Sequence, residues 1–305
     1  MTAAPPDTAL DGFREDRTYL GADHRRNERR TWMVAGVCVL ALAAQLAGGF
    51  AFNSMALIAG GLHMAAHVAA LLVAAFAYRL ARRYAADPRF AFGTGKLGYL
   101  AGFANAVALG FTAVLIGAES LERLIAPQPV AYGEALWLAV LGLVVSLVGM
   151  ALLGGGHRRS EGDINISAVH LHLSADAAVG VLAIAGLAGG QALGWGWADP
   201  LAGLVGAALV AQFAVGLVRK AGAVLLDFNP SPALTGEIRA RLAGPGERLI
   251  DLHLWQLGPG HHAAIVVVAA DHPQPAEAYR ARLAGLPGLS HLTVEVRASG
   301  AEHAH

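Results

Sequence analysis

The stretch SMALIAGGLHMAAHVAALLVAAFAYRL, residues Ser54 to Leu80, decides the fold. It has no carboxylate, lysine or arginine before Arg79, and as a helix it is long enough to cross the hydrocarbon core of a bilayer. His63 and His67 lie in its middle, four residues apart, so a helix places both imidazoles on one face. Ionisable groups are costly at that depth, so the pair indicates a functional site inside a membrane.

The composition of the whole chain also indicates an integral membrane protein. Of its 305 residues, 55% are strongly apolar and 14% are charged, whereas about 25% are charged in an ordinary soluble domain. The mean hydropathy is +0.50. A formal net charge of zero gives no indication of a broad basic surface for nucleic acid. A single cysteine, Cys38, cannot form a disulfide framework, and we expect it to be a small packing residue.

Six apolar stretches of about 20 residues predict six transmembrane helices. They run from Thr31 to Phe52, Ser54 to Arg79, about Leu97 to Ile116, about Ala135 to Leu153, about Ser167 to Ala188, and Asp199 to just before Arg219. Lysine and arginine gather before the first stretch and after the second, fourth and sixth, which predicts that both termini are cytoplasmic. We therefore expect a flexible cytoplasmic segment over residues 1–30, without a signal peptide, and a six-helix membrane domain over 31–220.

Beyond the last apolar stretch the composition changes, and a small α+β domain is expected over residues 221–298, with a tail over 299–305. The expected elements are a helix Pro232–Leu242 capped by Ser231, strands Leu249–Leu257 and Ala263–Ala269, a helix Gln274–Ala284 and a strand His291–Arg297. The residues between the first two strands, Gly258 to His262, carry a hairpin signal. The fold class is therefore an α-helical membrane protein with a C-terminal α+β domain.

A second polar pair, His172 and Asp176, has the same spacing as His63 and His67 and lies on the fifth apolar stretch. Three imidazoles and one carboxylate form a tetrahedral set that suits zinc, cobalt or nickel. His170 falls on the opposite side of that helix, and we interpret it as a non-ligand.

Other uses of intramembrane histidines fit less well. Two rings one turn apart cannot occupy both axial positions of one haem iron. A His-Glu-x-x-His peptidase needs its general base directly after the first histidine, and Met64 stands there. Protons and metal compete for imidazole, so a site exposed alternately to the two sides would let a proton gradient drive metal export. The alternative is a membrane metal sensor, or a metal-dependent membrane enzyme, that transports nothing.

From about Asp23 onward the chain resembles the cation diffusion facilitators. The resemblance rests on Ser54 to Ala59 leading into His63 and His67, Phe92-Gly93-Thr94-Gly95-Lys96, His172 with Asp176, Asp199-Pro200, Leu225-Leu226-Asp227 and Asp251-Leu252-His253-Leu254-Trp255. It implies six spans, a cytoplasmic ferredoxin-like domain and a homodimer that exchanges divalent metal for protons. It also implies that His63, His67, His172 and Asp176 bind the transported ion.

Finer features of the resemblance concern the metal and the assembly. His67, where many zinc exporters carry aspartate, and the segment Asn27 to Thr31 resemble the cobalt/nickel efflux (DmeF-like) branch. The family suggests that Lys96 and Asp227 lock together the two protomers or the cytoplasmic ends of the spans. Three positions depart from the family because they lack the acidic residues that are common there: Gly60, Gln45 and Tyr99.

We therefore expect a proton-coupled exporter of divalent metal in the inner membrane, without enzymatic activity or a resident cofactor. The expected cargo is cobalt or nickel, with zinc and cadmium as further candidates, because nitrogen-rich sites bind all of these ions. His253, His261 and His262 are candidates for a regulatory metal site in the cytoplasmic domain, although two adjacent hairpin residues face one ion only awkwardly.

Overall fold

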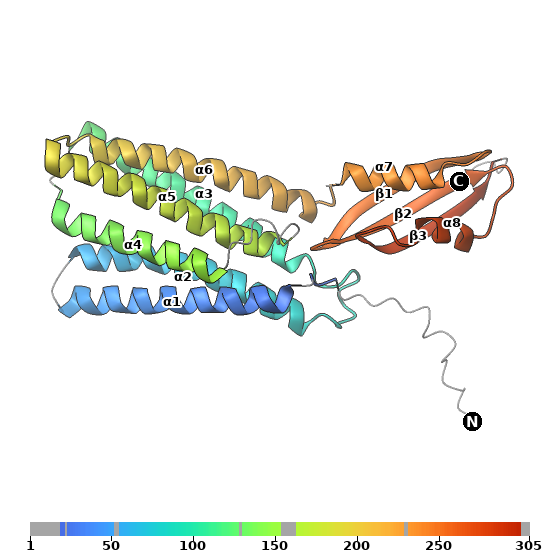
Figure 1. The fold of residues 1–305 in the computed structure, drawn as a ribbon, viewed down its shortest axis with the longest axis horizontal. Helices are drawn as coiled ribbons and strands as arrows, with labels where there is room; N and C mark the ends of the chain where they lie inside the picture. Colours follow the sequence, from blue (N-terminus) through green and yellow to red (C-terminus); the bar gives the residue numbers. More distant parts are fainter. Residues whose placement is uncertain are drawn as a thin grey trace, which may run out of the picture.

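The computed structural model describes residues 19–21, 23–51, 55–127, 130–153, 163–228 and 231–299. Within the second helix, the side chains of residues 55–63 and 66 are not described. The expected leader up to residue 18 and the tail from residue 300 lie outside the described residues. The described residues form a bundle of six long helices, followed by a small α+β domain at one end of the bundle (Figure 1).

The six helices run up and down the long axis of the bundle. They are α1 His24–Ala51, α2 Met55–Arg83, α3 Leu97–Ile125, α4 Tyr132–Leu153, α5 Ile164–Leu193 and α6 Ala198–Leu225. Judged on the described residues alone, all of these helices except α2 are long and apolar enough to cross a membrane. The 29-residue α2 lies among them and contacts α1 and α3, so the prediction of six crossings is supported directly for five helices.

The helices are longer than the apolar stretches that predict them. Helix α1 already begins at His24, inside the basic segment, and α6 continues to Leu225, past the residue 220 at which we expected the membrane domain to end. Capping residues set some of these ends. Asp163 accepts hydrogen bonds from the first free backbone N–H groups of α5, and Gly194 ends α5 with a left-handed φ of 70°.

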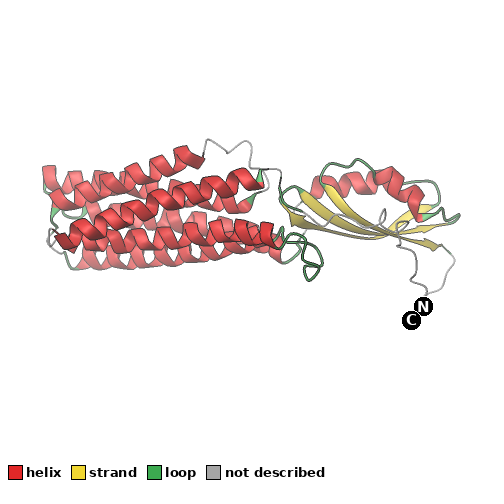
Figure 2. Cartoon of the chain, turned by 90° about the horizontal axis from the view of Figure 1, so that it is seen from below, coloured by secondary structure: helices red, strands yellow, loops and turns green. Residues whose placement is uncertain are grey.

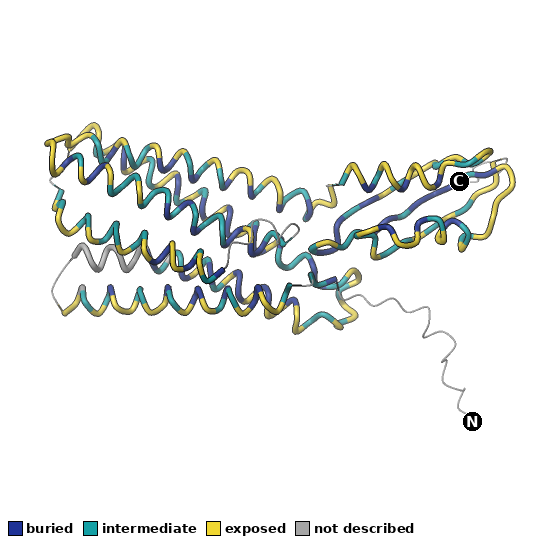
Figure 3. The backbone as a smooth tube through the Cα atoms, viewed as in Figure 1, coloured by how far each residue is buried: buried dark blue, intermediate teal, exposed yellow. Residues whose placement is uncertain are grey.

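The core of the bundle lies between α1, α2, α4 and α5. Val34 and Cys38 of α1 pack there with Leu71 of α2, Val145 of α4 and Leu173 of α5. Cys38 is free and buried, in agreement with the packing role predicted for it. Large apolar residues of the helices are exposed, among them Leu40, Phe111 and Trp137, as expected where side chains face lipid. Figure 3 shows how exposed and buried positions alternate along the helices.

The C-terminal domain contains α7 Pro232–Leu242, β1 Glu247–Gly258, β2 His261–Ala270, α8 Ala276–Leu283 and β3 Leu289–Ala298. Strands β1 and β2 form the predicted antiparallel hairpin, and β3 pairs in parallel with β2 to give the order β1-β2-β3. Ile238 of α7 and Tyr279 of α8 pack against Leu254 and Val266, so both helices cover the same face of the sheet (Figure 2). The observed elements therefore match the predicted α+β order.

The β1–β2 hairpin touches the end of the bundle nearest the C-terminal domain, hereafter the inner end. A Cβ atom added to Gly95 would lie 2.4 Å from the carbonyl oxygen of Leu257 and 2.7 Å from that of Tyr19. Glycine is therefore required at position 95, because the backbones approach too closely for any side chain. Beside this contact the rings of Phe92 and Trp255 meet edge to face, with their centroids 5.4 Å apart. The Phe-Gly-Thr-Gly-Lys loop thus joins the membrane helices to the domain.

Candidate metal centre

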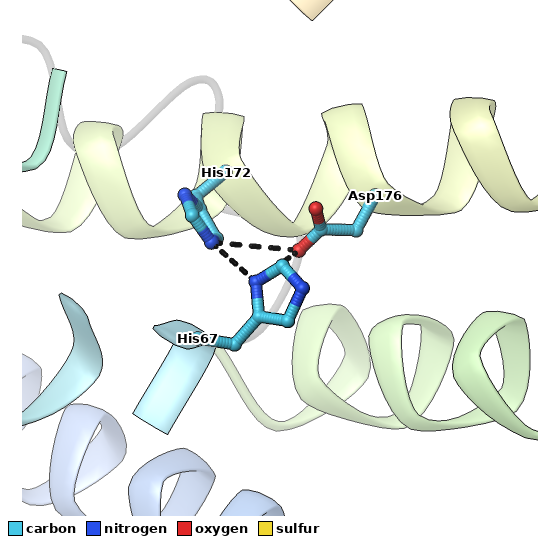
Figure 4. A group of neighbouring side chains, drawn as sticks. All are labelled: His67, His172 and Asp176. Carbon is cyan, nitrogen blue, oxygen red and sulfur yellow. Dashed lines mark hydrogen bonds and ion pairs between the residues drawn. The ribbon is translucent and has the colours of Figure 1, made fainter. Parts of the chain in front are cut away.

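Side chains from α2 and α5 meet inside the bundle. His172 and Asp176 extend from α5 toward His67 of α2 (Figure 4). The Nδ1 atom of His67 lies 2.7 Å from Nε2 of His172 and 3.3 Å from Oδ2 of Asp176. The Nε2 atom of His172 lies 3.6 Å from the same carboxylate oxygen. One potential ligand atom from each residue is thus within 4.8 Å of the other two.

The packing of α5 explains why its polar pair faces α2. Leu173 is buried in the core shared with α1, α2 and α4, whereas Ala175 is buried in a second cluster with Leu109 of α3 and Val210 of α6. Apolar contacts therefore hold α5 on two sides. The i, i+4 spacing then puts His172 and Asp176 together on the face between these contacts. At a rise of 1.5 Å per residue, Asp176 lies about 18 Å along α5 from its first residue, well inside this 30-residue helix.

The geometry suits a small cation. At metal–nitrogen distances of about 2.0–2.1 Å, tetrahedral ligand atoms are about 3.3–3.4 Å apart. Both carboxylate distances already lie near this value, and only the two imidazole nitrogens would need to separate slightly. Without an ion, a nitrogen–nitrogen distance of 2.7 Å fits an N–H of one ring donating to the other ring, with the donor set by the tautomers.

The two other histidines near this group are placed as follows. His63 lies one turn from His67 on the backbone of α2, but its side chain is outside the described residues. Its predicted part in the site stays a prediction. His170 is outside the group, and its Nδ1 lies 3.3 Å from the hydroxyl of Ser174.

A polar network at the inner end of the bundle was not identified from the sequence. One carboxylate oxygen of Asp163 accepts hydrogen bonds from the amide of Asn27 (2.8 Å) and from the hydroxyl of Tyr78 (2.7 Å). The imidazole of His24 contacts the backbone carbonyl of Tyr78 at 3.0 Å. Asp163 thereby ties α1 and α2 to the start of α5. The available signal was an aspartate directly before an apolar helix, which predicts the cap but not the distant partners.

The three positions that lack the acidic residues common in the family, Tyr99, Gln45 and Gly60, lie in different parts of the bundle. Tyr99 is buried at the inner end of α3, where its hydroxyl accepts a 2.6 Å hydrogen bond from Gln256 of the domain. Gln45 is buried in α1, and its carbonyl oxygen has no hydrogen-bond partner among the described residues. Gly60 lies in the part of α2 whose side chains are not described. Tyr99 therefore belongs to the junction with the domain rather than to the metal centre.

The Lys96 ammonium and the Asp227 carboxylate form an ion pair within one chain. Lys96 precedes α3 and Asp227 follows α6, so the pair joins the inner ends of these two helices. This arrangement corresponds to the second of the two predicted roles, a link between helix ends. Asp227 has a φ of 57°, a left-handed conformation that aspartate adopts more readily than most residues.

The three domain histidines make separate contacts. His253 pairs with Asp251 at 2.7 Å, His261 contacts the hydroxyl of Ser290 at 2.8 Å, and His262 contacts the carbonyl oxygen of Gly288 at 3.2 Å. Burial lowers the pKa of His262, which favours its neutral form. Within the described part of the chain, the only group of three potential metal ligands is that of His67, His172 and Asp176. The structure thus does not bring the domain histidines together.

Comparison with known proteins identifies the family. The cation efflux transmembrane domain matches residues 31–226, which covers the six helices apart from the first turns of α1. The chain belongs to the cation efflux, or cation diffusion facilitator, family. This cation efflux protein is therefore a multi-pass membrane transporter and not an enzyme.

Three relatives illustrate the range of the family. The cadmium, cobalt and zinc/H(+)-K(+) antiporter of Bacillus subtilis is 30% identical over 76% of this chain and 73% of its own length. The zinc transporter ZitB of Escherichia coli is 33% identical over 76% of this chain and 74% of its own. The metal cation efflux system protein CzcD of Cupriavidus metallidurans is 29% identical over 93% of each chain.

Proposed function

We propose that this protein exports divalent transition-metal ions from the cytoplasm in exchange for protons, and that His63, His67, His172 and Asp176 bind the transported ion. The observation that carries the proposal is the meeting of His67, His172 and Asp176 inside the bundle. His63 would be the fourth ligand because it lies one turn away on the same face of α2.

Proton coupling follows from the chemistry of these ligands. Imidazole binds a metal only when it is neutral, and carboxylate only when it is ionised. A proton taken up from an acidic outer side therefore weakens metal binding and favours release on that side. Once the site faces the cytoplasm again, proton loss restores the ligands. The network of Asn27, Tyr78 and Asp163 lies between the cytoplasm and the site, so we propose that it opens when metal enters.

For the cargo we propose cobalt or nickel first, and zinc or cadmium second. A site with three imidazoles and one carboxylate is richer in nitrogen than the family sites that carry aspartate in place of His67. Divalent affinity for such ligands rises from cobalt to nickel, but zinc also binds them well. We further propose that the protein is a homodimer in the inner membrane with both termini in the cytoplasm. The distribution of lysine and arginine supports the orientation of the termini.

Cellular metal content tests the proposal. Cells that lack this protein should accumulate the exported metal and become sensitive to it, and the wild-type chain should reverse both effects. The His172→Ala variant should reverse neither when it is produced at the same level in the membrane. Equal metal content with the wild-type chain and with this variant would favour the alternative, a sensor that binds metal without transporting it.

A further inference from the structure

A basic groove lies between the inner ends of α1 and α2, away from the metal centre. Arg25, Glu28, Arg29 and Trp32 line it from α1, and Arg82 lines it from α2. The spacing of the four α1 residues, i, i+3, i+4 and i+7, places them in one stripe along the helix. The groove has a volume of about 510 Å³ and is open to the surroundings of the protein.

The groove carries a surplus of positive charge. The guanidinium of Arg82 donates two hydrogen bonds to Glu28, at 2.9 and 3.0 Å, and thus neutralises the only carboxylate of the lining. Arg25 and Arg29 are exposed, and neither side chain has an ion pair or hydrogen bond with the residues that the structure describes. Among the described residues, these two guanidinium groups therefore carry the net positive charge of the groove. Their planar N–H donors match a phosphate group, which accepts such bonds in pairs.

The aromatic residues beside the groove indicate its level in the membrane. The rings of Trp32 and Phe76 meet edge to face, with their centroids 5.4 Å apart. Tryptophan is enriched at the level of lipid headgroups. Phe76 is half exposed. An amphiphile would therefore find cations at the membrane surface and an apolar wall directly beneath them.

We propose that this groove binds the phosphate headgroup of an anionic phospholipid from the cytoplasmic leaflet, with its acyl chains along Trp32 and Phe76. Basic pockets between transmembrane helices on the cytoplasmic side bind such headgroups in other membrane proteins. A free phosphate ion would satisfy the arginines but would leave the aromatic wall without a partner. The lipid therefore accounts for both parts of the groove. The site requires neither metal binding nor transport.

Lipid binding to the purified full-length protein tests this proposal. Native mass spectrometry would follow titrations with phosphatidylglycerol and, separately, with phosphatidylcholine. The double variant Arg25→Gln/Arg29→Gln removes the two exposed cations that line the groove. Its matched control, Arg219→Gln/Lys220→Gln, removes two exposed cations from the same end of the bundle but outside the groove. Arg25→Lys/Arg29→Lys keeps the charge and shows whether the positions tolerate substitution.

We expect Arg25→Gln/Arg29→Gln to weaken phosphatidylglycerol binding by about 10- to 30-fold, since each basic residue near an anionic surface contributes about 1 kcal/mol. The control pair should stay within about threefold of the wild type, and phosphatidylcholine should bind more weakly to all. The lysine pair should bind phosphatidylglycerol more tightly than the glutamine pair but more weakly than the wild type, because lysine keeps the charge and lacks the paired N–H donors. Equal losses in the glutamine and control pairs would indicate a diffuse surface charge and overturn the proposal. Displacement of the lipid by millimolar inorganic phosphate would overturn it in favour of a free-anion site.

Discussion

Replacing His172 with alanine removes one ligand of the proposed site. In the structure, Nε2 of His172 lies 2.7 Å from Nδ1 of His67 and 3.6 Å from the carboxylate of Asp176. A water molecule would have to replace the His172 imidazole as a ligand of the bound ion. Loss of a group that only supports a ligand costs 10- to 100-fold in metal affinity, so loss of the ligand itself should cost at least about 100-fold, or about 2.7 kcal/mol.

Equilibrium dialysis of the purified protein against Co²⁺ at neutral pH would measure this loss. The matched control is His170→Ala, which removes an imidazole from the same helix two residues away. That ring contacts Ser174 and lies outside the metal centre, so its removal should change the affinity by less than about twofold. Thermal unfolding of both variants checks that each is folded. Metal affinity of His172→Ala within about threefold of the wild type, or an equal loss in the two variants, would refute the reasoning.

Further predictions concern selectivity, the inner network and the junction with the domain. His67→Asp should lower the ratio of cobalt to zinc affinity in competition dialysis, because an oxygen replaces a nitrogen ligand; an unchanged ratio would contradict the assigned role. Asp163→Ala should destabilise the protein by about 2–4 kcal/mol in thermal or chemical unfolding, because the cap and the hydrogen bonds to a charged acceptor are both lost. Gly95→Ala should accelerate hydrogen exchange in β1, since a Cβ there would lie 2.4 Å from a carbonyl oxygen, and equal exchange would mean that the contact is dispensable. Lys96→Asp should weaken the link between the ends of α3 and α6, which crosslinking between the two helix ends would measure. The second change Asp227→Lys should restore the link only in part, because lysine is strained at a φ of 57°. Full rescue would contradict the strain argument.

The proximity of α2 and α5 at the metal centre was predictable from the sequence. Two i, i+4 pairs of polar residues in separate apolar stretches have few roles other than binding one ion together. The pattern therefore predicts that His67, His172 and Asp176 meet. The family resemblance pointed to the same residues. The fold class was predictable for a similar reason, because hydropathy marks the spans and the Gly258–His262 turn marks the hairpin.

Other parts required the structure, because they depend on distant partners or on helix ends. Asp163 binds Tyr78 and Asn27, which are 85 and 136 positions away, and no local pattern encodes either contact. Hydropathy shows where a helix crosses the bilayer but not where its backbone hydrogen bonds begin, so it does not predict that α1 starts at His24. The sequence relates Tyr99 only to the metal centre, because its hydrogen bond with Gln256 joins residues 157 positions apart.

Metal flux in proteoliposomes tests the central claim most directly. Purified protein would be reconstituted, and Co²⁺ movement would be followed while a pH gradient is imposed with the acidic side opposite the metal. We predict that the gradient accelerates Co²⁺ movement toward the acidic side, that protons move in the other direction, and that Asp176→Asn abolishes both fluxes. Metal movement that is indifferent to the pH gradient, or that continues unchanged in Asp176→Asn, would contradict proton-coupled transport through this site.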